Sequence, residues 1–151
     1  MGGLKKSSPH RLITAALASL GLLLLLAACE GSGGNEITFV SEVDGDAEVY
    51  VIDPDSGEAR PLTDNRSRDF GPVWSPNGKQ VAFVSDEAGD LEINVVDRKG
   101  EAITRLTHIT GDDETPLWSP DGRNLAFISN QDDNAEVYLM DAEGSLPTRI
   151  T

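Results

Sequence analysis

The sequence contains a single cysteine, Cys29, so no disulfide bond can form within the chain. Of its two histidines only His108 follows that cysteine, and a lone histidine without a nucleophile beside it does not make a catalytic triad. No cluster of Cys and His could hold zinc, and neither a Gly-x-Ser-x-Gly elbow nor a glycine-rich phosphate loop occurs. These absences predict a chain that is not an enzyme and that uses no cofactor.

Basic residues are also scarce. The 12 Lys and Arg residues are outnumbered by 26 Asp and Glu residues, which gives a formal net charge of -14 at pH 7. All the acidic residues follow Cys29, whereas Lys5, Lys6 and Arg11 precede it. A chain this negative is repelled by phosphate, which argues against nucleic acid as a partner. Because the acidic residues are spread over all of this part, we interpret them as a solvated surface.

Only residues 1–29 contain a long apolar run, and they have the organisation of an export signal. After the basic start, residues 12–28 carry no charge, and the run ends in Leu-Ala-Ala-Cys. This string resembles the bacterial lipobox, in which the cysteine becomes the new N-terminus and carries lipid, so Cys29 is the predicted lipidation site. Plain cleavage and a retained membrane anchor are the alternatives, because a run of this length is at the lower edge of what spans a bilayer.

The rest of the chain is repetitive. Residues 30–36 are rich in Gly and Ser, which predicts a flexible tether. After the tether, equivalent residues recur at a spacing of 44 positions, as in Ser41, Ser85 and Ser129. The repeating segments are 37–63, 64–107 and 108–151, and the two longer ones share 15 of 44 positions. A fixed period of this length indicates a repeat architecture in which each unit buries its apolar faces against its neighbours.

Each full repeat contains four short apolar runs separated by turn residues. In the first full repeat these runs are 72–75, 80–85, 91–97 and 102–107. They are rich in Val, Ile, Thr or aromatic residues, and none has the length or period of a helix. The second run is apolar at nearly every position, so both of its faces must be covered. The predicted fold is therefore all-β, with four-stranded antiparallel meanders stacked as the blades of a propeller.

The repeat motif also carries a specific resemblance. Each full repeat contains the string Trp-Ser-Pro-Asp/Asn-Gly-Lys/Arg, which is followed by Ala-Phe-Ile/Val-Ser. Later in the same repeat come Glu-Val/Ile-x-Val/Leu-x-Asp and then Arg-Leu/Ile-Thr. This pattern resembles the repeat of the TolB-type β-propellers from residue 37 to residue 151. The resemblance implies a propeller in the bacterial cell envelope that binds other proteins or peptides.

The number of blades leaves the ring incomplete. The blades 64–107 and 108–151 are full, whereas the blade 37–63 has three strands, and propellers usually close with four to eight blades. The chain is therefore a fragment of a longer protein, a homo-oligomer in which two chains supply roughly six blades, or an open stack. The fragment is the favoured interpretation, because the sequence stops at the end of a repeat without a closing strand.

Aromatic residues recur at equivalent places and are therefore predicted to pack between blades. They are Trp74, Trp118, Phe39, Phe83 and Phe127. A binding pocket is the alternative for the two tryptophans.

Two aspartates are candidates for binding. Asp69 and Asp113 lie three residues before the prolines that begin the first apolar runs, and the residues leading into a propeller's first strands sit at one mouth of its channel. They are predicted to contribute to a polar ring at that mouth, which could meet a cation, a peptide or a sugar. The alternative is a turn-capping role.

The hairpin between the second and third runs is acidic in every copy, as in Asp86, Glu87, Asp90 and Glu92. Such oxygen ligands suit Ca²⁺, but the EF-hand spacing is missing and alternate residues of a strand point to one side. No metal site is therefore predicted, and calcium at these hairpins is the alternative.

These observations predict a non-catalytic envelope lipoprotein, exported to the periplasmic or extracellular face and anchored to the membrane through a lipid on Cys29. Its blades would serve as a scaffold that binds proteins or peptides. One alternative is the N-terminal fragment of a propeller-containing enzyme of the prolyl-oligopeptidase-like or tricorn-like kind. Another is a module that binds carbohydrate or cations.

Overall fold

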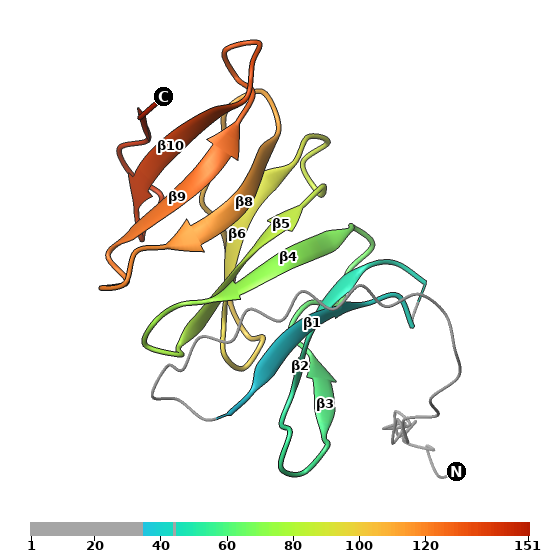
Figure 1. The fold of residues 1–151 in the computed structure, drawn as a ribbon. Coiled ribbons are helices and arrows are strands. Elements are labelled where there is room, and N and C mark those ends of the chain that lie inside the picture. Colours follow the sequence, from blue (N-terminus) through green and yellow to red (C-terminus); the bar gives the residue numbers. More distant parts are fainter. Residues whose placement is uncertain (1–34, 44) are drawn as a thin grey trace, which may run out of the picture.

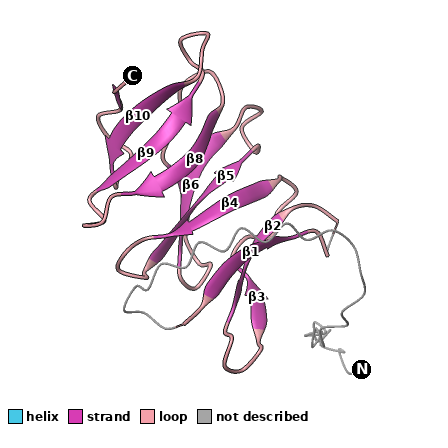
Figure 2. Cartoon of the chain, viewed as in Figure 1, coloured by secondary structure: helices cyan, strands magenta, loops and turns pink. Residues whose placement is uncertain are grey.

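The computed structural model describes residues 35–43 and 45–151, so the predicted signal peptide, Cys29 and most of the tether lie outside the described residues. Every regular element in the described part is a β-strand (Figures 1 and 2). Within these residues there is accordingly no helix with the length and apolar character needed to cross a bilayer. The all-β fold class predicted from the repeats is confirmed.

The strands form three antiparallel sheets, and each sheet lies within one sequence repeat. The first sheet contains β1 (Ile37–Ser41), β2 (Glu48–Ile52) and β3 (Ala59–Pro61). The second contains β4 (Asp69–Trp74), β5 (Gln80–Ser85), β6 (Glu92–Asp97) and β7 (Ile103–Arg105). The third contains β8 (Asp113–Trp118), β9 (Asn124–Ser129), β10 (Glu136–Asp141) and β11 (Thr148–Arg149). Neighbouring strands in each sheet are consecutive in the chain, which is the meander of a propeller blade.

The hairpins between the first two strands of each full blade follow from their turn residues. The backbone N–H of Gly78 donates to the carbonyl of Ser75 over 2.9 Å, and that of Gly122 donates to Ser119 over 2.8 Å. Both glycines have positive φ, 65° and 69°, which closes the turn that the preceding proline begins.

Two apolar cores lie between successive sheets, which Figure 1 shows as layers following one another along the chain. Strand β4 lies against β1 and β2, and β8 lies against β4, β5 and β6, so the first strand of each blade helps to cover the blade before it. The core between the first two blades contains Val49, Val51, Leu62, Val81, Phe83 and Val96. The core between the last two contains Val84, Ile93, Val95, Leu106, Trp118, Leu125, Phe127, Tyr138 and Met140, among others.

The middle and last blades differ in how well their second strands are covered. In β5 every residue from Val81 to Ser85 is buried, as the apolar run predicts. In β9 the face that carries Leu125 and Phe127 is buried, but Ile128 on the other face is exposed. The reason is that, among the described residues, no further blade follows the third.

The first strands of both full blades contain a bulge at the same place. The pairing with the second strand shifts between Phe70 and Val73 in β4 and between Glu114 and Leu117 in β8. The residue at the bulge has a left-handed backbone, with φ of 63° at Gly71 and 56° at Thr115. Glycine adopts this conformation freely, whereas a β-branched residue is strained in it.

We expect Thr115→Gly to raise the free energy of unfolding by about 0.5–1 kcal/mol, because relief of the left-handed strain exceeds the entropic cost of a glycine. Urea unfolding measures the change. The reciprocal control is Gly71→Ala, which should lower stability by a similar amount. A Cβ at Gly71 would meet only Val84 Cγ2, at 3.8 Å, so backbone strain rather than a clash would be the cause. An unchanged or reduced stability of Thr115→Gly would contradict the interpretation.

Candidate functional site

The two candidate aspartates lie at the junctions between blades. Asp69 is the first residue of β4 and Asp113 is the first residue of β8, and both are almost fully buried, at 0% and 1% exposure. The backbone N–H of Asp69 donates to the carbonyl of Ala47 over 2.7 Å, and that of Asp113 donates to the carbonyl of Leu91 over 2.7 Å. Each aspartate is therefore bonded to the preceding blade, with its carboxylate enclosed between two sheets.

Around Asp69 the side chains form a cluster that we call the first polar junction: Glu48, Thr63, Asn65, Asp69 and Ser85. Asn65 joins the two carboxylates, because its backbone N–H donates to Glu48 Oε1 and its side-chain Nδ2 donates to Asp69 Oδ2, both over 2.8 Å. The hydroxyl oxygen of Thr63 accepts the N–H of Val49 over 2.9 Å. Strand β2 of the first blade is thus tied, through the linker residue Asn65, to the first residue of β4 in the next blade.

The second polar junction repeats part of this arrangement one blade later with Glu92, Thr107, Asp113 and Ser129. Ile109 stands where Asn65 stands in the first junction, so the side chain at this position cannot join the two carboxylates. The hydroxyl of Thr107 accepts the N–H of Ile93 over 2.8 Å and donates to Glu92 Oε2 over 2.5 Å. Asp113 is paired with Ser129 across β8 and β9, as Asp69 is with Ser85 across β4 and β5. The repeat spacing had aligned these residues, but it did not reveal that they converge.

Burial raises the pKa of the four carboxyl groups in the two junctions, Glu48, Asp69, Glu92 and Asp113. Desolvation is the main cause in each case, because it penalises the charged form. Nearby hydroxyl groups oppose it in part: Thr107 lowers the pKa of Glu92, and Ser129 lowers that of Asp113.

The third blade contains the same pair of residues in an open setting. The hydroxyl of Thr151 accepts the N–H of Val137 over 2.9 Å and donates to Glu136 Oε2 over 2.6 Å. Here the pKa of Glu136 is lowered, chiefly by the hydrogen bond from Thr151. Among the described residues, no aspartate of a following first strand encloses this pair, so the desolvation that raises the pKa of Glu48 and Glu92 does not prevail.

Four of the five predicted packing residues, Trp74, Trp118, Phe83 and Phe127, belong to the two cores between blades, whereas Phe39 belongs to neither. Trp118 is buried and its Nε1 donates to the carbonyl of Val73 in the preceding blade over 3.3 Å. Trp74 is half-buried and packs on the core between the first two blades. Phe83 and Phe127 are buried, whereas Phe39 is half-buried and lies 5.6 Å, between ring centroids, from Tyr50.

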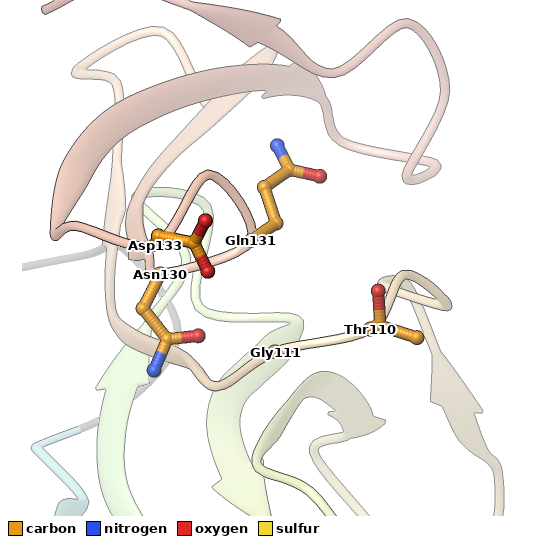
Figure 3. A pocket seen from close by; sticks show the side chains of 5 residues that line it. All are labelled: Thr110, Gly111, Asn130, Gln131 and Asp133. Carbon is orange, nitrogen blue, oxygen red and sulfur yellow. The ribbon is translucent and has the colours of Figure 1, made fainter.

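One open hollow of about 440 Å³ lies at the end of the third blade where Asp113 begins β8 (Figure 3). Its walls come from the β9–β10 hairpin and from the loop that precedes β8. The lining residues are Thr110, Gly111, Asn130, Gln131 and Asp133. The sequence did not predict these residues, because residues that line a hollow and residues of an ordinary solvated turn have the same polar composition in a hairpin.

Hydrogen bonds hold the two walls of the hollow together. The backbone N–H of Asp112 donates to Asn130 Oδ1 over 2.8 Å, and the N–H of Gly111 donates to Asp90 Oδ2 in the preceding blade over 3.2 Å. Gly111 has a φ of 114°, which residues with a side chain rarely adopt, and a Cβ there would lie 3.0 Å from the backbone nitrogen of Gln131, so this position favours glycine. The hollow is therefore built on a fixed loop that spans two blades.

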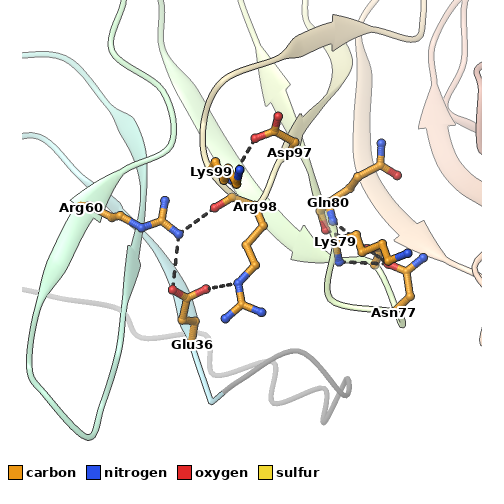
Figure 4. Close-up of polar contacts among 9 residues, drawn as sticks. Glu36, Arg60, Asn77, Lys79, Gln80, Asp97, Arg98 and Lys99 are labelled. Atoms are coloured by element: carbon orange, nitrogen blue, oxygen red, sulfur yellow. Dashed lines mark hydrogen bonds and ion pairs between the residues drawn. The ribbon is translucent and has the colours of Figure 1, made fainter.

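A second set of polar contacts connects the first two blades at the opposite ends of their strands (Figure 4). Glu36 Oε2 lies 2.8 Å from Arg98 Nε, and Glu36 Oε1 lies 3.3 Å from Arg60 Nη2. Arg60 Nη2 also donates to the carbonyl of Arg98 over 2.7 Å. These residues precede β1, belong to β3 and follow β6, so one carboxylate connects both sheets.

The structure offers no clustered metal ligands in the part it describes: no three Asp, Glu, His or Cys side chains converge there. His108 accepts a hydrogen bond at Nδ1 from Arg105 Nε over 2.8 Å. Asp132 of the acidic β9–β10 hairpin is engaged by Tyr138 and Arg149, over 2.6 and 3.0 Å.

Stacked antiparallel meanders with polar junctions between them define the chain as consecutive blades of a β-propeller. The family model described as the TolB beta propeller domain matches residues 24–151, and the chain belongs to this family. No curated protein matches the sequence.

Solved structures agree with the family assignment. The putative TolB from Agrobacterium tumefaciens is 30% identical with a TM-score of 0.71, over 76% of this chain and 44% of that one. TolB from Acinetobacter baumannii is 26% identical with a TM-score of 0.70, over 77% and 29%. Dipeptidyl peptidase 4 from Porphyromonas gingivalis shares the fold alone, at 21% identity and a TM-score of 0.64, over 79% and 17%. The chain thus spans less than half the length of each.

The raised pKa values of Glu48, Asp69, Glu92 and Asp113 predict an unusual pH dependence of stability. Their folded-state pKa values lie above the unfolded ones, so the stability they contribute is fully present below about pH 4 and is lost as the pH rises through the folded values. We therefore expect the urea midpoint of unfolding to be higher at about pH 5 than at about pH 7.5.

Asp113→Asn removes one of these titrating groups, so the dependence of the midpoint on pH should become shallower in this variant. Asp121→Asn is the matched control, because the hydroxyl of Ser119 lowers the pKa of this exposed carboxyl, which stays ionised in both states over that pH range. A midpoint that rises steadily with pH in the parent chain would contradict the burial argument.

Proposed function

We propose that this chain is a non-catalytic cell-envelope lipoprotein whose TolB-type blades bind a protein or a peptide. The observation that supports the proposal most directly is the hollow beside the second polar junction. Its walls are fixed by hydrogen bonds from Gly111 to Asp90 and from Asp112 to Asn130, and they present amide, hydroxyl and carboxylate groups to solvent. Groups of this kind pair with the N–H and C=O groups of a peptide.

The charge of the chain favours a particular kind of peptide. The formal net charge is -14, and Asp133 lies in the wall of the hollow. Complementary charge speeds the encounter with a partner and rejects partners of like charge. The preferred partner is therefore a segment of an envelope protein with Lys, Arg or a free amino terminus.

The location of the protein is part of the same proposal. The apolar run that ends at Cys29 supports export and attachment of a lipid to that cysteine, and the Gly/Ser tether supports a position of the blades away from the bilayer. Membership of the TolB propeller family agrees with a role in the bacterial envelope.

The alternative is that these blades belong to a larger hydrolase of the propeller-containing kind. The likeness to a dipeptidyl peptidase concerns the fold alone, and fold does not determine function. His108 is the one histidine after Cys29, and its Nδ1 is occupied by Arg105. We therefore favour binding over catalysis for this chain.

A photo-crosslinking amino acid in place of Gln131 tests the binding proposal. In cells that produce the full chain, illumination should join it to a discrete envelope protein, because Gln131 lines the hollow. The matched control replaces Arg123, whose side chain is 84% exposed in the hairpin at the other end of the blade. Equal adducts from both positions, or none from Gln131, would contradict binding at the hollow.

Replacement of Cys29 by alanine tests the anchor. The wild-type chain should partition with membranes after cell lysis and enter the detergent phase of a Triton X-114 separation, whereas Cys29→Ala should move to the soluble fraction or retain its leader. Labelling with a radioactive fatty acid should be lost in the same variant. If Cys29→Ala keeps both the label and the membrane association, the lipid lies elsewhere.

A further inference from the structure

The hollow of the third blade is bounded by residues that a further blade would leave in place. Its walls are the loop before β8 and the β9–β10 hairpin. The middle blade shows where a following linker contacts such a hairpin, because the linker before β8 is bonded to Asp90 and Leu91. The equivalents of these two residues in the third blade are Asn134 and Ala135, which do not line the hollow. The hollow therefore does not depend on whether another blade follows.

One wall of the hollow carries a carboxylate at a position that favours glycine. The residues one and two repeats before Asp133 are Gly89 and Gly45. All three have a left-handed backbone, with φ of 68° at Asp133, 103° at Gly89 and 118° at Gly45. Aspartate adopts this conformation less readily than glycine does. The third blade thus holds a carboxylate at the hollow at some cost in backbone energy, and residues held in this way are concentrated at functional sites.

The carboxylate of Asp133 has no hydrogen-bond or ion-pair partner among the described residues. Its neighbour Asp132 is engaged, because it accepts hydrogen bonds from Tyr138 and Arg149 over 2.6 and 3.0 Å. The backbone N–H of Asp133 donates to the carbonyl of Asn130 over 3.0 Å, which fixes the turn and leaves the carboxylate in the wall of the hollow (Figure 3). An unpaired carboxylate in a concave site attracts a cation.

The linker before the second blade supplies cations that the linker before the third lacks. It contains Arg66 and Arg68, and the N–H of Arg68 donates to Asp86 Oδ1 in the acidic β5–β6 hairpin over 2.8 Å. The equivalent residues before β8 are Thr110 and Asp112, and none of the five residues that line the hollow is basic. The chain itself therefore places guanidinium groups on the linker at the first hairpin, whereas at the hollow this role is left to another molecule.

The groups in the walls suit a guanidinium group better than an ammonium group. Asp133 offers both of its carboxylate oxygens, and Thr110 and Gln131 add neutral oxygen acceptors from the linker and the hairpin. A guanidinium group presents its N–H donors as a planar fork, which bonds a carboxylate through parallel hydrogen bonds and keeps further donors for other acceptors. An ammonium group is more strongly hydrated, so it loses more of its interaction with water on entering the hollow.

We propose that the hollow receives the arginine side chain of a partner segment, and that Asp133 selects this side chain by pairing with its guanidinium group. The proposal rests on the proposed binding of a peptide at the hollow, and it adds the residue that decides which peptide binds. Thr110 and Gln131 orient the planar group. Lysine and a free amino terminus, which carry ammonium groups, bind there more weakly than arginine.

Titration of the full chain in detergent with short peptides tests the selection. The probe is a Gly/Ser peptide with one central arginine and blocked termini, and the amide NMR signals of residues 110–111 and 130–133 report binding. Matched peptides contain lysine, or citrulline, which has the shape of arginine without its charge. The arginine peptide should bind about tenfold more tightly than either. Absence of binding by the arginine peptide, or equal binding of a matched peptide, would overturn the proposal.

Asp133→Gly is the variant that isolates the carboxylate, because it restores the residue of the first two blades at a left-handed position and so preserves the turn. In this variant the arginine and citrulline peptides should bind equally. Glu143→Gln is the control for net charge, since Glu143 is exposed in the turn at the opposite end of the blade, and it should keep the preference for arginine. Loss of the preference in both variants would assign it to the overall charge and overturn the role of Asp133.

Photo-crosslinking from Gln131 in cells separates this proposal from the proposed function. The yield of adducts should fall about tenfold when Asp133→Gly is combined with the crosslinking residue. Adducts at full yield in that background would leave binding at the hollow intact and overturn selection by Asp133. Selective binding of the arginine peptide without adducts in cells would support selection by Asp133 and remove an envelope protein as the partner.

Discussion

The burial of one sheet by the next is the interaction on which this structure depends. Strand β5 is apolar from Val81 to Val84, with apolar side chains on both faces, so the sheet that contains it cannot be stable with either face in water. The first blade covers one face with Val49, Val51 and Leu62, and the third covers the other with Trp118, Leu125 and Phe127. A blade is thus stable only as a member of a stack, which makes its stability a property of its neighbours.

Apolar faces alone would allow sheets to slide over one another, and the polar junctions provide the specificity that apolar contact lacks. Asp69 is bonded through its N–H to Ala47 and through its carboxylate to Asn65, so only one register satisfies both. The cost is a set of carboxyl groups whose pKa values are raised by burial. Buried polar groups that fix an arrangement at some expense of stability are known in other folds, and the repetition of the junction in successive blades fits that role here.

The sequence predicted the blades well because the repeat spacing and the turn residues are local signals. The hairpin turns that end at Gly78 and Gly122 can be predicted from the four residues of each turn alone. The polar junctions could not be predicted, because Glu92, Thr107 and Asp113 converge from separate strands and look like solvated acids in a chain with 26 of them. The strain at Thr115 was hidden too, since threonine gives no sign of a left-handed backbone. The apolar residues beside Ile128 in the sequence predict that it is buried, yet its exposure depends on whether another blade covers that face of the sheet.

The sheets and the loops of a blade are under different constraints, and this difference determines where a binding surface can form. Both faces of the middle sheet are committed to packing, so side chains there cannot change without loss of contacts to a neighbouring blade. The loops at the ends of the strands are free of this constraint, provided that each linker between blades still brings the first strand of the next blade to its position in the sheet. Gly111 and Asp112 belong to the linker that carries the chain from one blade to the next, and their bonds to Asp90 and Asn130 fix it against two hairpins. A surface made by such linkers is as rigid as the stack beneath it, which lowers the entropic cost of holding a partner.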